Sequence, residues 1–288
     1  MSAEIDGYSG PISSLSAPDS LANGDSGHIT ADLSCGNGAT VKIQIEASSE
    51  NKEIELTRSV YVSCTGVCGK RTIPAGCVDN SVPSSGQTTA CSVEINKQNQ
   101  YTKTISNATI EGALDVANTG NQVNITLIGT IIKNYVKINT SAQIGFDLGD
   151  TAEVQNGVKF ITDSQIDPNI DGKVEGGICI ESGEVNNLSS NGGEITGPIS
   201  IDSTDQIKIN RLKNSSIEKL DLSSGGQVQI KAQASTIDGD IDIDSPSGQV
   251  KVLRNFKNST ITGDITVTSD SQITIKPKET IINGDIDA

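Results

Sequence analysis

A repeat of about 21 residues constrains this chain more than any other feature. The segments 235–252, 259–275 and 280–287 share the pattern I-x-G-x-I-x-I-x-S, which is followed in the first two by Q-[IV]-x-[IV]. We call the first apolar residue of the pattern the coil start. Successive coil starts are 20 to 24 residues apart. They fall at Ile110, Ile132, Val154, Val174, Ile195, Ile217, Ile237, Ile261 and Ile282.

This period suits a coil of three short strands and three corners, so residues 104–288 are predicted to form a parallel β-helix of about nine coils. The coil start and the positions four and six residues later are nearly always aliphatic, for example Ile237, Ile241 and Ile243. Alternation by two directs these side chains inward. Gly or Asn follows two residues after most coil starts, as at Gly239 and Gly263, and is expected to supply positive φ at a tight corner.

A glutamine precedes the second apolar strand in seven coils, and stacked side-chain amides are expected to form a hydrogen-bonded ladder along the axis. This column comprises Gln122, Gln143, Gln165, Gln206, Gln227, Gln249 and Gln272. At the level of architecture, the periodicity resembles right-handed parallel β-helix proteins, namely pectate-lyase-like enzymes, phage tailspikes, haemagglutinin-type adhesins and bactofilins. The resemblance covers about two thirds of the chain and implies a right-handed coil, but its residue types are common to many solenoids and indicate no single family.

The first third of the chain has a different pattern. ATVKIQIEA (39–47) and KEIELTRSVYVSC (52–64) alternate apolar and polar residues around a hairpin turn, and further strands are predicted in 89–96 and 100–107. These features predict a small disulfide-braced β-sandwich over residues 29–103. Residues 1–28 are predicted to be an extended segment.

Six cysteines, five of them in the first third, favour disulfides in an oxidising compartment, so an extracellular or cell-surface location is predicted. Zinc is the alternative, but the Cys64–Cys68 spacing is unusual for it and the sequence has a single histidine. Cys179, on an outward position of its coil, is expected to pair with the first domain or with a neighbouring subunit. The cysteines are Cys35, Cys64, Cys68, Cys77, Cys91 and Cys179.

The formal net charge of −15 argues against nucleic acid or an anionic membrane surface as a partner. No membrane-spanning run and no signal peptide are recognised in the sequence as given. Asn-x-Ser/Thr sequons add weak support for an exported glycoprotein. The six sequons begin at Asn107, Asn124, Asn139, Asn187, Asn214 and Asn258, and the glycosylation candidates are Asn107, Asn214 and Asn258.

Acidic residues are dense near the C-terminus. Stacked carboxylates repel one another, so this column is either well solvated or neutralised by a cation, for which Ca²⁺ is the best candidate. No other cofactor is predicted. The candidate calcium ligands are Asp240, Asp264 and Asp285, three residues after a coil start, and Asp242 and Asp287, five residues after one.

The last coil starts at Ile282 and is expected to leave an open strand edge. EIDGYSGPIS (4–13) resembles the repeat itself, so the N-terminal segment of one subunit is expected to complete or cover the last coil of the next by strand addition, giving a head-to-tail homopolymer. A frayed terminus is the simpler alternative. The candidate assembly residues are Ile5, Gly7, Pro11, Ile12, Ile282, Gly284 and Ile286.

No catalytic pair can be distinguished from the surface acids, and the one histidine lies outside the repeats. The leading interpretation is therefore a non-enzymatic structural subunit of an extracellular filament or surface appendage. An adhesin or tail-fibre-like module that binds a cell-surface ligand is the alternative, and an enzyme acting on acidic polysaccharide is a third possibility.

Overall fold

The computed structural model describes residues 77–252 and 256–288 together with Cys68, and in the N-terminal part the backbone of five strands. The chain divides into two compact units, residues 1–70 and 71–288. Every regular element of the described residues is a strand, so the all-β prediction is confirmed. None of these residues belongs to a helix that could cross a membrane.

In the N-terminal unit the predicted hairpin is present. Strands β4 (Thr40–Ser48) and β5 (Glu55–Ser63) pair antiparallel along their whole length. Strand β1 (Ala3–Asp6) pairs antiparallel with β4, and β2 (Ile12–Ser16) pairs with β3 (Thr30–Leu33). The predicted sandwich over 29–103 otherwise falls largely outside the described residues.

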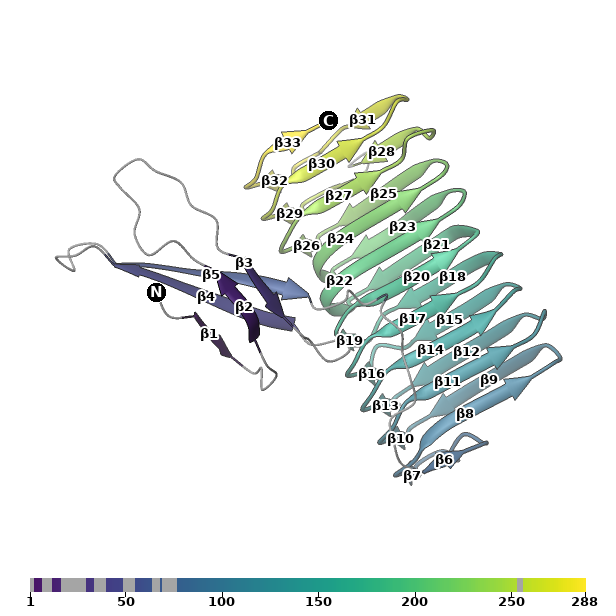
Figure 1. The fold of residues 1–288 in the computed structure, drawn as a ribbon. Coiled ribbons are helices and arrows are strands. Elements are labelled where there is room, and N and C mark those ends of the chain that lie inside the picture. Colours follow the sequence, from purple (N-terminus) through teal and green to yellow (C-terminus); the bar gives the residue numbers. More distant parts are fainter. Residues whose placement is uncertain are drawn as a thin grey trace. The chain divides into compact units, whose positions relative to one another are not determined.

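The second unit is a parallel β-solenoid, in which each coil contributes strands to three faces (Figure 1). The first face consists of very short strands that follow a corner of the coil. It contains β7 (Thr88–Thr89), β10 (Thr109–Ile110), β13 (Ile131–Ile132), β16 (Glu153–Val154), β19 (Lys173–Glu175), β26 (Thr236–Ile237), β29 (Thr260–Ile261) and β32 (Ile281–Ile282).

The second face follows in the same sheet. Two long strands, β22 (Glu194–Ser203) and β24 (Ser216–Ser224), run through both faces. The other strands of the second face are β6 (Val78–Asp79), β8 (Ser92–Lys97), β11 (Leu114–Asn118), β14 (Val136–Thr140), β17 (Val158–Ile161), β20 (Ile178–Ser182), β27 (Ile241–Asp244), β30 (Ile265–Thr268) and β33 (Ile286–Asp287).

The third face is a separate sheet of nine parallel strands, one from each complete coil. Stacking at about 4.8 Å per strand makes this unit rod-like. The strands are β9 (Tyr101–Ser106), β12 (Val123–Ile128), β15 (Ile144–Leu148), β18 (Gln165–Ile170), β21 (Glu184–Asn191), β23 (Ile207–Lys213), β25 (Val228–Gln233), β28 (Val250–Val252) and β31 (Ile273–Ile275).

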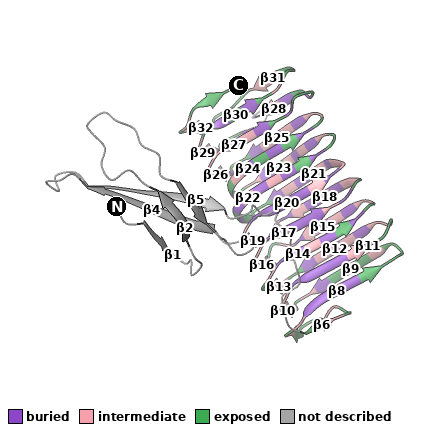
Figure 2. Cartoon of the chain, viewed as in Figure 1, coloured by how far each residue is buried: buried purple, intermediate pink, exposed green. Residues whose placement is uncertain are grey.

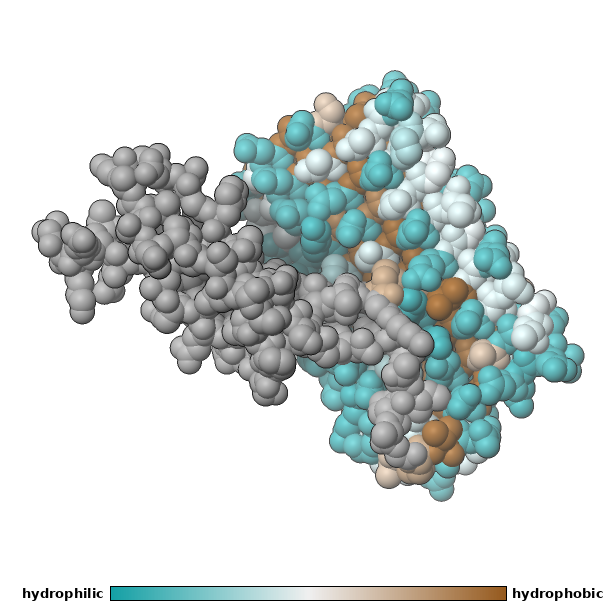
Figure 3. Space-filling view, viewed as in Figure 1, coloured by the Kyte–Doolittle hydropathy of each residue, from teal (hydrophilic) through white to brown (hydrophobic). Residues whose placement is uncertain are grey.

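One apolar core runs along the axis, as the rows of buried residues in Figure 2 show. The inward positions are those that the repeat predicts. Ile237 is 1% exposed, Ile241 0% and Ile243 3%. Phe146 and Phe160 contact each other in the core with ring centroids 5.0 Å apart. On the face shown in Figure 3, hydrophilic and apolar residues form alternating rows along the axis.

The solenoid begins one coil earlier than the sequence predicted. Strand β8 pairs in parallel with β11, and β9 pairs in parallel with β12, so 89–96 and 100–107 form a coil and not a part of the first domain. The predicted boundary at residues 103/104 is therefore wrong. The repeat was masked because Thr89 stands where later coils have an aliphatic start, and Cys91 stands where they have Gly or Asn.

A short segment covers the N-terminal end of the second face. Strand β6 pairs in parallel with β8, and the N–H of Ser92 donates to the carbonyl oxygen of Cys77 at 3.1 Å. The disulfide between Cys77 and Cys91 holds this segment in place. Val82 packs against the core beneath the first coil.

Candidate functional surface: the polar columns of the solenoid

The outward side chains of the solenoid form columns because equivalent residues of successive coils lie side by side. The predicted glutamine ladder is present in the first coils. The amide of Gln100 donates to Gln122 at 3.3 Å, and the amide of Gln122 donates to Gln143 at 3.3 Å. Gln100, in the coil that the repeat search missed, is the signal that could have revealed it.

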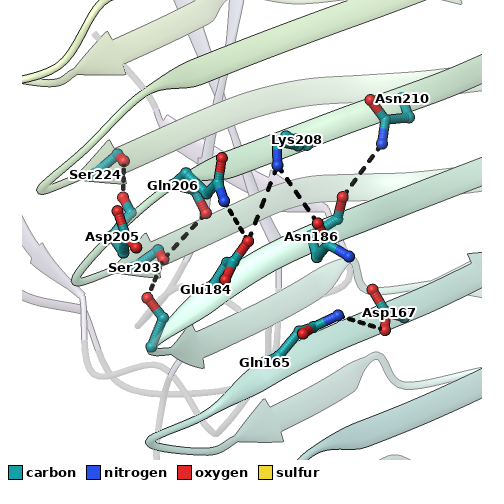
Figure 4. Close-up of polar contacts among 11 residues, drawn as sticks. Gln165, Asp167, Glu184, Asn186, Ser203, Asp205, Gln206, Lys208, Asn210 and Ser224 are labelled. Atoms are coloured by element: carbon teal, nitrogen blue, oxygen red, sulfur yellow. Dashed lines mark hydrogen bonds and ion pairs between the residues drawn. The ribbon is translucent and has the colours of Figure 1, made fainter.

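Carboxylates replace glutamine as acceptors further along the rod. Gln143 and Gln165 both donate to Oδ2 of Asp167, at 3.0 and 2.9 Å, and Gln206 donates to Glu184 (Figure 4). For Gln227, Gln249 and Gln272, no side-chain bond from one amide to the next is found among the described residues, so the predicted ladder does not reach the last coils.

A second column of hydroxyl groups lies at the corner between the second and third faces. Ser203 donates to the carbonyl oxygen of Gly183 at 3.0 Å, Ser224 to that of Asp205 at 2.5 Å, and Ser245 to that of Gly226 at 2.6 Å. Each acceptor belongs to the preceding coil. These buried hydroxyls therefore tie neighbouring coils together, because each donates to a backbone carbonyl of the preceding coil.

The acidic column of the C-terminal coils also has a structural partner. The backbone N–H of Asp264 donates to Oδ1 of Asp240 at 3.0 Å, and that of Asp285 donates to Oδ1 of Asp264 at 2.8 Å. Sequence reasoning considered solvent and a cation as the neutralising partners and missed the backbone of the next coil. An amide donor stabilises the ionised carboxylate, because its partial positive charge lies against the oxygen.

The two remaining candidate ligands do not join this column. Asp242 lies beside Asp221 and Thr266 in the register of the second face, and Thr266 separates it from Asp287. Asp242 forms an ion pair with Lys219 at 2.6 Å. Among the described residues, none of the five carboxylates belongs to a group of three or more acidic, His or Cys side chains that could hold a metal ion together. Calcium binding stays a prediction, and the adjacent pairs are Asp240 with Asp264 and Asp264 with Asp285.

The glycines two residues after the coil starts are needed for a different reason than expected. Positive φ occurs at Gly176 and Gly197, but it is not found at Gly239, Gly263 or Gly284. A Cβ on Gly263 would lie 2.6 Å from the backbone nitrogen of Asp240. Close approach of the coil below therefore excludes a side chain at this corner, which also leaves room for the Asp240 carboxylate.

The left-handed corner lies instead three residues before the coil start. Asn107, Asn214 and Asn258 have φ of 50°, 52° and 52°, and Ala234 has φ of 50° at the equivalent position. These asparagines are the three glycosylation candidates, and all are exposed. Asn tolerates this left-handed conformation. A small buried residue and then a Ser or Thr follow it in each of these coils, so the residue preferences of the corner are enough to produce an Asn-x-Ser/Thr sequence. Glycosylation stays a prediction.

The described cysteines are all oxidised. Cys77 pairs with Cys91, and Cys68 and Cys179 are also disulfide-bonded. The prediction of disulfides is therefore confirmed for these four, while Cys35 and Cys64 lie outside the described residues. Disulfides of this kind indicate an oxidising, extracellular type of environment.

The candidate assembly residues lie in two groups. Ile282 and Ile286 belong to β32 and β33, and Ile286 is 48% exposed. In the N-terminal unit Ile5 pairs with Ile43 of the same chain and Ile12 pairs with Leu33, whereas Gly7 and Pro11 lie outside the described residues. Strands β1 and β2 are thus paired within the chain, and strand addition to another subunit would require them to exchange partners.

No family model matches the sequence, and neither a curated protein nor a solved structure was found to match it. The resemblance to known proteins is therefore one of architecture. The parallel coils, the axial core and the stacked polar columns give this chain the architecture of the parallel β-helix proteins.

Proposed function

We propose that this chain is a structural subunit of an extracellular filament or surface appendage, in which the solenoid is the stiff element. The observation that carries the proposal is the continuity of axial contacts. Backbone hydrogen bonds, buried serine hydroxyls and the Asp column each join one coil to the next along the axis.

The edge of the last coil supports head-to-tail assembly by strand addition or by coil stacking. Ile286 is 48% exposed, whereas the equivalent core position one coil earlier, Ile265, is 0% exposed. Ile281, on an outward position of the same last coil, is 60% exposed. The backbone edge of β31, β32 and β33 offers parallel pairing to an added strand. At the other end, β6 already occupies the edge of β8, so coil stacking there requires β6 to move.

Negative-stain electron microscopy and light scattering of the full chain test this proposal. Filaments that shorten or disappear in the variant Ile281→Lys/Ile286→Lys are the expected result, because two ammonium groups at the edge oppose apolar contact. The variant Thr262→Lys/Thr266→Lys, on exposed positions of the preceding coil, is the matched control. A monodisperse wild-type protein at all concentrations would exclude the filament and favour the adhesin alternative, for which a glycan and cell-binding screen is the direct assay.

A further inference from the structure

The C-terminal half of the solenoid separates its charges by face. In the last four complete coils the third-face strands β23, β25, β28 and β31 contain no acidic residue, although the whole chain carries a net charge of −15. We define the basic strip as six of the seven described lysines of these strands and of the corners that follow them, leaving out Lys276. They are Lys208, Lys213, Lys231, Lys251, Lys257 and Lys278.

Strand register places five of these six lysines in two columns, and Lys231 lies outside both. Lys208 lies beside Gln229, which lies beside Lys251. In the second column Lys213 lies beside Gln233, Gln233 beside Lys257, and Lys257 beside Lys278. Glutamine thus separates most stacked ammonium groups, and this spacing limits the repulsion between like charges that face each other across strands.

Among the described residues, the basic strip is almost without counter-charges. Within the described residues only Lys208 has an ion pair, with Glu184 at 4.0 Å. Most lysines of the strip thus lie along one face without an ion pair to a described residue, although the whole chain carries a net charge of −15. Such a surface attracts an anionic surface of similar length.

The second face of the last coils, together with the corner that precedes it, supplies an anionic surface of similar length. We define the acidic strip as Asp202, Asp221, Asp240, Asp244, Asp264 and Asp285. Asp202 and Asp244 belong to one column with Ser223 between them, so this column also alternates charged and neutral residues. Both strips repeat with the rise of the coil, about 4.8 Å.

We propose that the basic strip of one solenoid binds the acidic strip of a second copy, so that the rods associate side by side. Charge complementarity, the common repeat and the shared position along the rod carry this inference. Lateral pairing goes beyond the proposed head-to-tail function and does not depend on it, because isolated subunits present both strips. The two strips lie on different faces, so each rod can bind a neighbour on either side.

Ionic strength should govern this contact. At physiological salt the screening length is about 8 Å, which leaves charges in contact effective and weakens the long-range repulsion between two chains of net negative charge. Self-association measured by sedimentation equilibrium of the full chain is therefore expected at 0.15 M NaCl and should fall at least tenfold at 1 M NaCl.

Charge reversal tests which faces are involved. The first variant, Lys231→Glu/Lys251→Glu/Lys257→Glu, reverses the basic strip. The second, Asp202→Lys/Asp221→Lys/Asp244→Lys, reverses aspartates whose carboxylates accept no hydrogen bond from a described residue. Each variant alone should lose at least tenfold in association at 0.15 M NaCl. A mixture of the two should regain it, because each reversed strip meets a complementary strip on the other variant.

The control Lys97→Glu/Lys103→Glu/Lys133→Glu changes the net charge equally on the first coils and should associate like the wild type. Equal loss in this control, no salt dependence, or no recovery in the mixture overturns the proposal. Binding of heparin by a monomeric wild type, abolished by the Lys231/Lys251/Lys257 variant, also overturns it and assigns the basic strip to an acidic polysaccharide. All substitutions leave the β31–β33 edge intact. If end-to-end filaments form but lateral pairs do not, the lateral proposal fails while the proposed head-to-tail function stands.

Discussion

The backbone N–H of Asp264 donates to the Oδ1 of Asp240, one coil below, at 3.0 Å. The same contact joins Asp285 to Asp264. In each case a glycine precedes the donor, and the absence of a Cβ lets the lower carboxylate reach the amide. The repeated Gly-Asp pair is therefore a device for joining coils, and it explains why an acidic column accumulates in the part of the rod where this pair recurs.

The Asp240 contact predicts a specific pattern of stability. Asp240→Ala should lower the free energy of unfolding by about 0.5–1.5 kcal/mol, because the Asp264 amide loses its charged acceptor. Asp240→Asn retains an acceptor oxygen and reduces repulsion between carboxylates, so it should stay close to the wild type. Asp238→Ala, at an exposed neighbour, is the control, and chemical denaturation is the measurement. Equal losses in Asp238→Ala and Asp240→Ala would contradict this role.

Gly263→Ala should be strongly destabilising, by about 2–4 kcal/mol, because the new Cβ meets the backbone of the preceding coil. Gly192 is the matched glycine. It has φ of 86° but no atom within 4 Å of a built Cβ, so Gly192→Ala should cost only about 1–2 kcal/mol through its left-handed backbone. Thermal unfolding measures the loss of stability in each variant, and so compares the cost of steric crowding at Gly263 with the cost of backbone strain at Gly192. The reverse order of the two losses would show that close approach is not the controlling factor.

Ala234→Gly should stabilise the protein by about 0.5–1 kcal/mol, because glycine relieves the left-handed strain and its greater unfolded-state entropy offsets only part of that gain. Ala234 is exposed, so little packing is lost. Ala117→Gly in strand β11 is the control and should destabilise by about 0.5–1 kcal/mol. Unfolding midpoints in urea provide the comparison, and a loss of stability in Ala234→Gly would refute the corner assignment.

Removal of the Cys77–Cys91 disulfide should loosen the N-terminal cover of the solenoid. The bond joins residues separated by 14 positions. Closing a loop of this size is worth about 3 kcal/mol in the unfolded-chain entropy model. In Cys77→Ser/Cys91→Ser, hydrogen exchange should accelerate at the amide of Ser92, which donates to the Cys77 carbonyl, and stay unchanged in β30. Uniform acceleration along the rod would indicate that the segment is not a local cap.

The Asp115 carboxyl should give the stability a measurable pH dependence. Burial raises the pKa of Asp115, and Lys137, whose Nζ lies 3.1 Å from Oδ2, offsets part of this rise. A carboxyl whose pKa is higher in the folded state binds its proton more tightly there. Its contribution to stability is therefore greatest when it is protonated and declines as the pH rises from the ordinary Asp pKa, about 3.9, through the folded-state pKa.

Comparison of the wild type with Asp115→Asn isolates this term. The stability of the variant relative to the wild type should increase from acidic to neutral pH, because only the wild type ionises at this position. Urea denaturation at several pH values measures the difference, and a difference that is constant with pH would contradict the raised pKa.

The sequence by itself determined the solenoid, its coil starts and its inward residues. Burial at positions such as Ile237, Ile241 and Ile243 follows from an alternation that can be seen within a few residues of one segment. The coil that starts at Ile217 lacks one residue before its next inward position, and this deletion is visible in the sequence. The inward residue Leu220 pairs with Ile199, as the repeat requires. These features are local, and their repetition along the chain makes them visible.

Only the tertiary structure decided what the outward residues contact. The role of Gly263, the acceptor of the Asp264 amide and the first coil around Thr89 depend on atoms about 20 residues away in sequence that stacking brings together. The separation of lysines and aspartates onto different faces likewise arises only when each coil closes into three strands. Physically, side-chain alternation is a property of one strand, whereas close approach and charge complementarity are properties of the surfaces that neighbouring strands build together.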